Sequence, residues 1–353
     1  MGKRIVVVGA GAVGGYVGGH LARTGEDVTF VDPWPENVER IRTVGFDLKG
    51  YTPEEHCVVK VPALHITELQ SLSKQAPVDI AFVSMKSYDT EWATMMIKQY
   101  LAPGGFVVSL QNGINEERIA SVVGWGKTVG CIASKISVEL TGPGEIRRTV
   151  PLGSPGHIVF RVGEVHGRIT ERVKMLDAMI SRIDTCKITT NLWGERWSKL
   201  VVNSMRNGLS AATGQGGNAN DRMELTRRFA IRLGSEAVRI GKALGYELEN
   251  IGNIPPDILE QAGQGDADAL AKCEDLMITA SKGKSDDQRP SMGQDMIKGR
   301  RTEIEFLNGL VVEKGEEVGI PAPANAAMVD LVRRVERGEL EPSPDHIARL
   351  SNI

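Results

Sequence analysis

The first 32 residues constrain the fold more than any other part of the chain. A β-branched and apolar run from Arg4 to Val8 ends at Gly9, and a helical stretch follows from about Ala12 to Thr24. A second β-rich run, Val28 to Val31, ends at Asp32. A strand, a helix and a second strand within about 30 residues predict a βαβ unit, whose two strands pair in parallel.

The turn between the first strand and its helix fits the pattern G-x-G-x-x-G. Gly9 permits the tight turn, Gly11 lets the backbone approach a pyrophosphate, and Gly14 lets the helix pack close to the sheet. The start of the helix supplies N–H groups and the positive end of a dipole for the phosphates. The pattern predicts a dinucleotide site, with a purely structural glycine turn as the alternative. Its residues are Gly9, Ala10, Gly11, Ala12, Val13 and Gly14.

Asp32 stands at the carboxyl end of the second strand, where an acidic side chain can accept hydrogen bonds from the adenosine ribose hydroxyls. A 2′-phosphate at that position would meet like charge. Asp32 therefore predicts NAD as the preferred cofactor over NADP. The alternative is that Asp32 caps a helix that begins near Pro33 or Pro35.

The strand and helix pattern continues beyond this unit. Apolar strands are predicted at Ile80 to Ser84 and Phe106 to Leu110, with a helix between them that includes Thr90 to Tyr100. This alternation indicates a doubly wound parallel sheet. Between Val129 and Val162, β-branched runs are broken by glycine and proline, and we expect them to extend the sheet with antiparallel strands.

From about Asn191 onward strand signals nearly vanish, and Arg222 to Leu244 and Met292 to Val318 place apolar residues at helical spacing. Within Gly265 to Pro290 we expect a helix at Ala267 to Ala280 and a mobile loop elsewhere.

A chain of 353 residues usually forms two domains. The predicted fold is an α/β Rossmann domain with a doubly wound parallel sheet, residues 1–188, followed by a mostly α-helical substrate and catalytic domain, residues 189–353.

Charge and composition exclude several classes of partner. The chain has 42 Lys+Arg against 45 Asp+Glu, and this net charge of −3 gives no field that would attract nucleic acid or an anionic membrane. No apolar run is long enough to span a bilayer, and no export signal is visible, so we expect a cytoplasmic protein. The four cysteines lack zinc or disulfide spacing, so no metal site is expected.

Polar side chains follow two of the predicted strands. Lys86 lies in Met85-Lys86-Ser87, and Asn112 lies in Gln111-Asn112-Gly113. Ligands of open parallel sheets bind beyond the carboxyl ends of the strands, so both residues are expected near the nicotinamide. For Lys86 alone, a solvated loop lysine is the alternative.

In the second half, Trp197 to Asn207 is predicted to be a helix in which Lys199, Asn203 and Asn207 recur every four residues. A polar stripe on an otherwise apolar helix indicates a wetted cleft, and an ordinary solvent face is the alternative. On spacing alone, Glu303 is most simply a surface salt-bridge partner of Arg300 or of another nearby cation, and the charge periodicity does not separate this interpretation from a catalytic role.

Taken together, these motifs resemble the ketopantoate reductase (2-dehydropantoate 2-reductase) family, and the resemblance covers nearly the whole chain. The anchors are Gly9 to Gly14, Met85-Lys86-Ser87, Gln111-Asn112-Gly113, Trp197 to Asn203 with Asn207, Ser291-Met292-x-Gln294-Asp295, and Arg301 to Glu305 with Asn308-Gly309.

The resemblance implies roles for most of these residues. Lys199 would be the general acid that protonates the substrate carbonyl oxygen, and Glu303 would orient Lys199 and hold polar groups of the substrate. Asn112 would contact cofactor and substrate, and Lys86 would lie near the cofactor. The substrate's carboxylate or hydroxyl would be bound by Asn203, Asn207 and Ser291.

Four features depart from the family's usual pattern. Asp32 stands where a basic residue is usual, Gly208 replaces a proline, and Arg206 replaces an apolar residue. The chain is also longer, with the extra sequence expected between Ile254 and Pro290.

The sequence thus predicts an NAD(H)-dependent oxidoreductase that transfers hydride between the nicotinamide and a small 2-oxo or 2-hydroxy acid. One alternative is a dehydrogenase of a different hydroxy or opine-type compound. Another is a non-catalytic protein that binds NAD(H) and senses its redox state. The expected partner is a small carboxylate substrate, and the apolar faces of the helical half are compatible with a homodimer.

Overall fold

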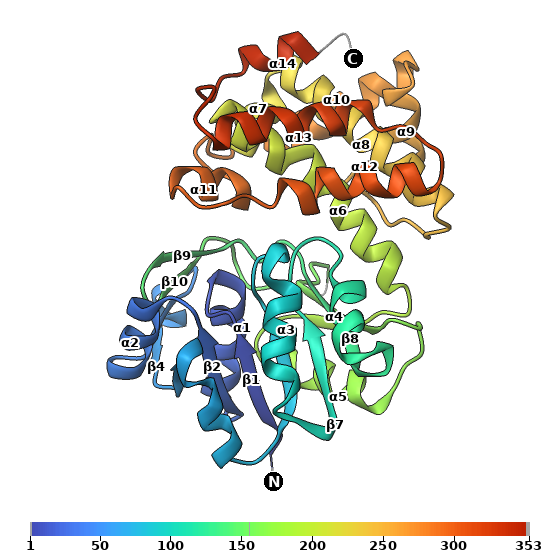
Figure 1. Ribbon diagram of the computed structural model, residues 1–353. Helices are drawn as coiled ribbons and strands as arrows, with labels where there is room; N and C mark the ends of the chain where they lie inside the picture. The colour runs from blue at the N-terminus through green and yellow to red at the C-terminus, as the bar shows by residue number, and fades with distance from the viewer. Residues whose placement is uncertain (1, 155, 351–353) are drawn as a thin grey trace. The chain divides into compact units, whose positions relative to one another are not determined.

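The computed structural model describes residues 2–154 and 156–350, so Met1, Pro155 and the last three residues lie outside the description. The chain divides into two compact units, Met1–Leu192 and Trp193–Ile353. Figure 1 shows strands and helices in the first unit and helices in the second. None of the helices among the described residues is long and apolar enough to cross a membrane.

An eight-stranded sheet forms the centre of the first unit, in the order β12-β11-β8-β7-β6-β1-β2-β5. Every pairing in it is parallel except that of β11 with β8. The predicted doubly wound parallel sheet is therefore confirmed. The strands are β1 (Arg4–Val8), β2 (Asp27–Asp32), β5 (Ala63–His65), β6 (Val78–Val83), β7 (Leu101–Ser109), β8 (Thr128–Ala133), β11 (Phe160–Glu164) and β12 (Cys186–Ile188).

Both faces of this sheet are buried, which explains why its strands are continuously apolar rather than alternating. In β1, Ile5 and Val7 belong to one buried cluster, and Val6 and Val8 belong to another. The α-helices of the unit are α1 (Ala12–Arg23), α2 (Pro35–Thr43), α3 (Thr90–Lys98), α4 (Glu116–Val123) and α5 (Glu171–Ile180), and the 3₁₀ turns are η1 (Pro53–Glu55), η2 (Ile66–Lys74), η3 (Ser87–Asp89) and η4 (Trp125–Lys127).

A second, four-stranded sheet corrects one expectation for the segment Val129 to Val162. Of its strands, β11 extends the main sheet antiparallel, as expected, and β8 joins that sheet in parallel. However, β9 (Val138–Gly142) and β10 (Glu145–Arg148) pair instead with β3 (Phe46–Lys49) and β4 (Cys57–Val59), in the order β4-β3-β10-β9.

The physical reason for the second sheet lies in the glycines of α1. A β-carbon on Gly15 would lie 2.4 Å from Ile146 Cδ1 and 3.0 Å from Phe46 Cε1. One on Gly19 would lie 3.1 Å from Leu48 Cδ1. The second sheet therefore packs on a glycine face of α1, a tertiary contact that the strand pattern alone does not reveal.

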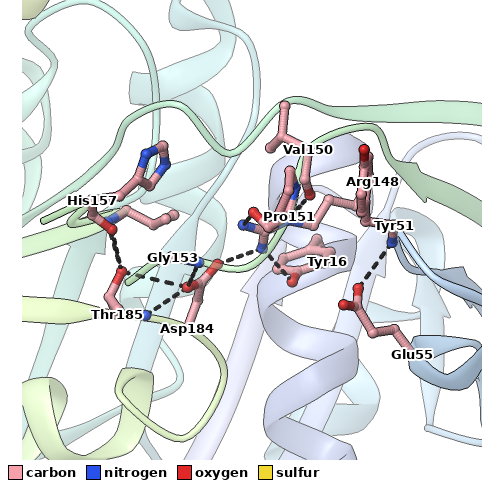
Figure 2. Close-up of polar contacts among 11 residues, drawn as sticks. Tyr16, Tyr51, Glu55, Arg148, Val150, Pro151, Gly153, His157, Asp184 and Thr185 are labelled. Carbon is pink, nitrogen blue, oxygen red and sulfur yellow. Dashed lines mark hydrogen bonds and ion pairs between the residues drawn. The ribbon is translucent and has the colours of Figure 1, made fainter. Parts of the chain in front are cut away.

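A buried ion pair holds the segment after β10 in place (Figure 2). Arg148 pairs with Asp184, and the side chains of both residues are almost completely buried. The Arg148 guanidinium also donates to the Tyr16 hydroxyl on α1 (2.7 Å) and to the carbonyls of Val150 and Pro151 (2.9 Å each). Asp184 Oδ1 accepts the Gly153 N–H at 2.8 Å. The cluster thereby ties one loop to α1 and to the chain before β12.

The second unit is helical, as predicted. Its elements are α6 (Leu192–Thr213), α7 (Gly217–Arg222), α8 (Glu224–Ala243), α9 (Pro256–Gly263), α10 (Ala267–Ser281), α11 (Ser291–Ile297), the 3₁₀ turn η5 (Ile304–Phe306), α12 (Asn308–Glu317), α13 (Pro323–Glu336) and α14 (Asp345–Leu350).

Two expectations about the helical unit are resolved by these bounds. The segment Met292 to Val318 is not one continuous helix, because the chain between α11 and α12 turns at Gly299, where φ is +61°, and at η5. The helix predicted at Ala267 to Ala280 is confirmed as α10. The segment Ile254 to Pro290, where the extra length is expected, contains α9 and α10.

Candidate cofactor and substrate sites

The structure accounts differently for each of the three glycines in the turn after β1. Gly9 has φ +101° and donates its N–H to the Val31 carbonyl at 2.8 Å. A β-carbon on Gly14 would lie 2.2 Å from the Gly9 carbonyl oxygen, so only glycine fits there. A β-carbon on Gly11 would meet no atom of residues 2–154 or 156–350 within 4 Å, its own chain neighbours aside. The turn itself therefore does not require glycine at position 11, which fits a close approach by a ligand.

The start of α1 is suited to an anion. Gly11 is the N-cap residue and supplies no side-chain hydrogen bond, and the first turn holds no acidic residue. The helix geometry leaves the first N–H groups, including those of Ala12 and Val13, without intrahelical acceptors. These groups and the helix dipole can hold the pyrophosphate of a dinucleotide.

Asp32 organises the same turn. Its Oδ2 accepts the Ala10 N–H at 2.6 Å, and its Oδ1 accepts the Trp34 N–H at 2.9 Å. It does not cap α2, because Trp34 is the N-cap residue of that helix and Pro35 begins it. A carboxylate has about four acceptor sites in all, so an acidic side chain at the end of this strand is suited to accept hydrogen bonds from ribose hydroxyls.

The turns after β6 and β7 are joined by amide side chains. Gln111 Nε2 donates to the Met85 carbonyl and to Thr90 Oγ1, both at 2.8 Å. Asn115 Nδ2 donates to Ser87 Oγ at 3.1 Å and to the Asn112 carbonyl at 2.8 Å. This network holds the turns that carry Lys86 and Asn112, both half-buried, at the same edge of the sheet.

Sequence reasoning did not single out Gln111 and Asn115 as residues that position this site. An amide directly after a strand was a usable signal for Gln111, because the carboxyl ends of parallel strands converge. Asn115 gave no such signal, because its contact with Ser87 depends on how the two turns fold toward each other.

At the carboxyl end of the next strand, β8, the backbone is strained. Lys135 has φ +57° and Ser137 has φ +42°, and within residues 2–154 and 156–350 no other non-glycine residue has a positive φ. The Thr149 N–H donates to the Ser137 carbonyl at 3.0 Å and helps to hold this turn. Residues held in such conformations often cluster at functional sites, but these two give no sequence signal because neither is glycine or asparagine.

In the helical unit, the polar stripe of α6 meets the start of α11. Asn207 Oδ1 accepts the Ser291 hydroxyl at 3.1 Å and the Met292 N–H at 3.2 Å, and Asn207 Nδ2 donates to the Asn203 carbonyl at 3.3 Å. Asn207 is 5% exposed, so the solvent-face alternative is wrong for this residue. The fold thus joins two predicted substrate residues that lie 84 positions apart.

Asn203 contributes an unsatisfied donor to this stripe. Its Nδ2 is buried and has no hydrogen-bond partner among the described residues. Leaving a buried polar group unpaired costs about 1–3 kcal/mol. A ligand oxygen bound beside the stripe would remove that cost.

Glu303 is 5% exposed, so the surface alternative is wrong for it. Glu305 instead forms the exposed ion pairs of this segment, with Arg301 at 3.1 Å and Arg333 at 2.6 Å. Lys199 and Glu303 both belong to the unit Trp193–Ile353. Among the residues that the structure describes, no group of three or more His, Cys, Asp or Glu side chains is arranged to hold a metal ion.

Comparison with known proteins relates both units to one family. The model described as "Ketopantoate reductase PanE/ApbA" matches residues 5–161, and "Ketopantoate reductase PanE/ApbA C terminal" matches residues 191–336. The 2-dehydropantoate 2-reductase of Archaeoglobus fulgidus is 28% identical over 345 residues, which cover 95% of this chain and 99% of that protein. That of Pyrococcus horikoshii is 28% identical over 336 residues, covering 94% and 97%.

Solved structures agree with these matches. A PanE/ApbA family ketopantoate reductase from Ralstonia eutropha superimposes with a TM-score of 0.76 at 27% identity, covering 96% of this chain and 99% of that one. A D-mandelate dehydrogenase solved with NADH and anilino(oxo)acetate gives a TM-score of 0.78 at 21% identity, covering 95% and 99%. At that identity the second match shows the fold alone.

Proposed function

Because the chain belongs to the ketopantoate reductase family and is an oxidoreductase acting on CH–OH groups, we propose that it interconverts a small 2-oxo acid and its 2-hydroxy acid with NAD(H). Asn203 carries the proposal. Its amide nitrogen Nδ2 is buried and has no hydrogen-bond partner within the part of the chain that the structure describes, and the residue lies one helical turn after Lys199 and one turn before Asn207. A polar substrate bound there would accept a hydrogen bond from it.

Lys199 is the proposed acid and base. When bound, the nicotinamide supplies or accepts the hydride. A carbonyl that receives hydride develops negative charge on its oxygen, and the Lys199 ammonium stabilises that charge and donates a proton to it. In the oxidative direction, neutral Lys199 removes the hydroxyl proton. Glu303 is proposed to orient Lys199 and to hold polar groups of the substrate.

The remaining residues position the reactants. Asn203, Asn207 and Ser291 are proposed to bind the carboxylate or hydroxyl of the substrate. Asn112 would contact both cofactor and substrate, and Lys86 would lie near the cofactor. The glycine turn from Gly9 to Gly14 would hold the pyrophosphate.

The proposed preference for NAD over NADP rests on Asp32. Its carboxylate is held by the N–H groups of Ala10 and Trp34 at the end of β2, where a 2′-phosphate would be repelled. The NADH in the D-mandelate dehydrogenase structure is consistent with an NAD-type member on this fold. A homodimer is also proposed, and light scattering of the purified protein tests it.

A steady-state assay that follows NADH absorbance tests the function. Ketopantoate is titrated with NADH and then with NADPH, and the assay is repeated with a panel of 2-oxo and 2-hydroxy acids. Turnover of ketopantoate with NADH supports the substrate and the cofactor together. If the enzyme turns over another acid but not ketopantoate, the proposed hydride transfer is supported and ketopantoate is rejected as the substrate. Binding of NADH without turnover of any acid favours the redox sensor.

A further inference from the structure

The polar stripe of α6 extends beyond the three residues already described. At 100° per residue, Arg206 lies about 20° from Lys199 and about 60° from Asn203 around the helix axis, so all three share one face. Arg206 follows Asn203 by three residues, or roughly 4.5 Å along that axis. A substrate that lies along this face from Lys199 past Asn203 therefore extends toward a guanidinium.

Neighbouring residues of α7 fix the Arg206 side chain. Its Nη1 pairs with Asp221 Oδ2 at 3.0 Å, and its Nη2 is 3.4 Å from Asn218 Oδ1. A β-carbon on Gly217 would lie 2.7 Å from Nη2, so the glycine leaves room for the guanidinium. The charged group is thus held in place before any ligand arrives, which lowers the entropy cost of binding.

The guanidinium nevertheless keeps capacity for a further acceptor. Its side chain is 35% exposed, whereas that of Asp221 is 5% exposed. Asp221 and Asn218 engage two of the five N–H donors that a guanidinium carries. Burial raises the pKa of the Asp221 carboxyl, and the charge of Arg206 opposes that rise. The buried carboxylate orients the guanidinium, and the exposed part of Arg206 can bind a ligand anion.

From this placement we propose that Arg206 is a specificity-determining residue that binds a second carboxylate at the distal end of the substrate. The preferred substrates are then 2-oxo dicarboxylic acids rather than monocarboxylic acids of the same length. A bidentate guanidinium–carboxylate contact is strong and geometrically selective. This inference rests on the proposed function, because it takes the reacting carbonyl to be at Lys199.

The test compares two five-carbon acids that differ only at the far end, 2-oxopentanedioate and 2-oxopentanoate. Wild-type enzyme is expected to use the diacid with a kcat/KM at least about tenfold higher. Arg206→Leu is expected to remove that advantage, mainly through KM for the diacid, while kcat/KM for the monoacid changes less than about threefold. The proposal is overturned if the wild-type enzyme prefers the monoacid. It is also overturned if Arg206→Leu leaves the ratio of the two kcat/KM values, diacid over monoacid, unchanged.

Two further variants keep the test decisive. Arg206→Leu leaves Asp221 buried without its partner, so the double variant Arg206→Leu/Asp221→Leu is measured alongside it and is expected to lose the same advantage. Arg228→Leu removes an exposed arginine paired with Glu224 and Glu274, and its ratio should match that of the wild type. Loss of the diacid preference in Arg228→Leu as well would overturn a specific role for Arg206.

Equilibrium binding separates this inference from the proposed function. Calorimetric titration of the enzyme–NADH complex with pentanedioate and with pentanoate requires no turnover. One outcome is that no 2-oxo acid is reduced, yet pentanedioate binds at least about tenfold more tightly than pentanoate and this difference depends on Arg206. That outcome supports the distal carboxylate site and rejects the proposed reaction. Equal binding of the two acids overturns the site, whatever the enzyme reduces.

Discussion

The cofactor turn and the substrate stripe are built in opposite ways. The turn from Gly9 to Gly14 offers backbone N–H groups, and its three glycines carry no side chain that would block them. Its residues are consecutive in the sequence. The stripe on α6 is made of side chains, and it is completed by Ser291, which lies 84 positions from its partner Asn207. A backbone site can therefore be read from a short motif, whereas a side-chain site depends on packing between distant segments.

The largest expected effect concerns the reacting residue of the stripe. Lys199→Ala should lower kcat by about 10²–10⁴-fold, because the proton donor to the carbonyl oxygen is lost. The Kd for NADH, measured by fluorescence titration, should change less than about twofold, because the cofactor turn does not use this side chain.

Lys242→Ala is the matched control for that measurement. Lys242 is an exposed lysine of the same unit, paired with Asp257 and Glu260, and its loss should leave kcat near the wild-type value. A kcat within threefold of wild type for Lys199→Ala would remove Lys199 from the mechanism and would leave the stripe with a binding role only.

The second prediction concerns the buried ion pair of Arg148 and Asp184 in the unit Met1–Leu192, which also contains the cofactor turn. Arg148→Met should lower the free energy of unfolding by about 3–5 kcal/mol, because it leaves the buried carboxylate of Asp184 without its ion-pair partner. Urea denaturation measures the change. At low temperature kcat should stay near wild type, since the cluster in Figure 2 positions a loop rather than a proposed reacting group.

Arg147→Met is the control from the neighbouring position of the same strand. The Arg147 side chain is 54% exposed and is paired with Glu139, so its loss should change stability by less than about 0.5 kcal/mol. If the free energy of unfolding falls equally in Arg148→Met and Arg147→Met, the buried ion pair with Asp184 contributes no more to stability than an exposed ion pair.

The difference between the two regions also explains what the sequence could predict. The first βαβ unit, the helical second half and the glycine turn follow from local periodicity and from one motif. The separate sheet of β9 and β10 did not, because strand partners depend on the glycine face of α1 against which Ile146 packs. The burial of Glu303 was equally invisible, because its charge pattern resembles that of exposed Glu305.

A third prediction separates two glycines of the same motif. Gly14→Ala places a β-carbon 2.2 Å from a backbone oxygen and should cost about 1–3 kcal/mol of stability. Gly11→Ala places a β-carbon in open space and should leave stability within about 0.5 kcal/mol, yet raise the Kd for NADH at least about tenfold. Thermal unfolding and fluorescence titration measure the two effects. Unchanged NADH binding in Gly11→Ala would place the pyrophosphate elsewhere.

The smallest expected effect is the cofactor preference, and it tests whether one side chain adds selectivity to a backbone site. Asp32→Asn keeps the size of the side chain but removes its charge, so the ratio of the Kd values for NADPH and NADH should fall by about tenfold or more. The ratio is the informative quantity, because losing a hydrogen bond from Ala10 or Trp34 would weaken the binding of NADH and NADPH equally. Asp27→Asn, at the exposed opposite end of β2, should leave the ratio unchanged. If both variants give the wild-type ratio, Asp32 only braces the turn, and selectivity against the 2′-phosphate comes from other residues.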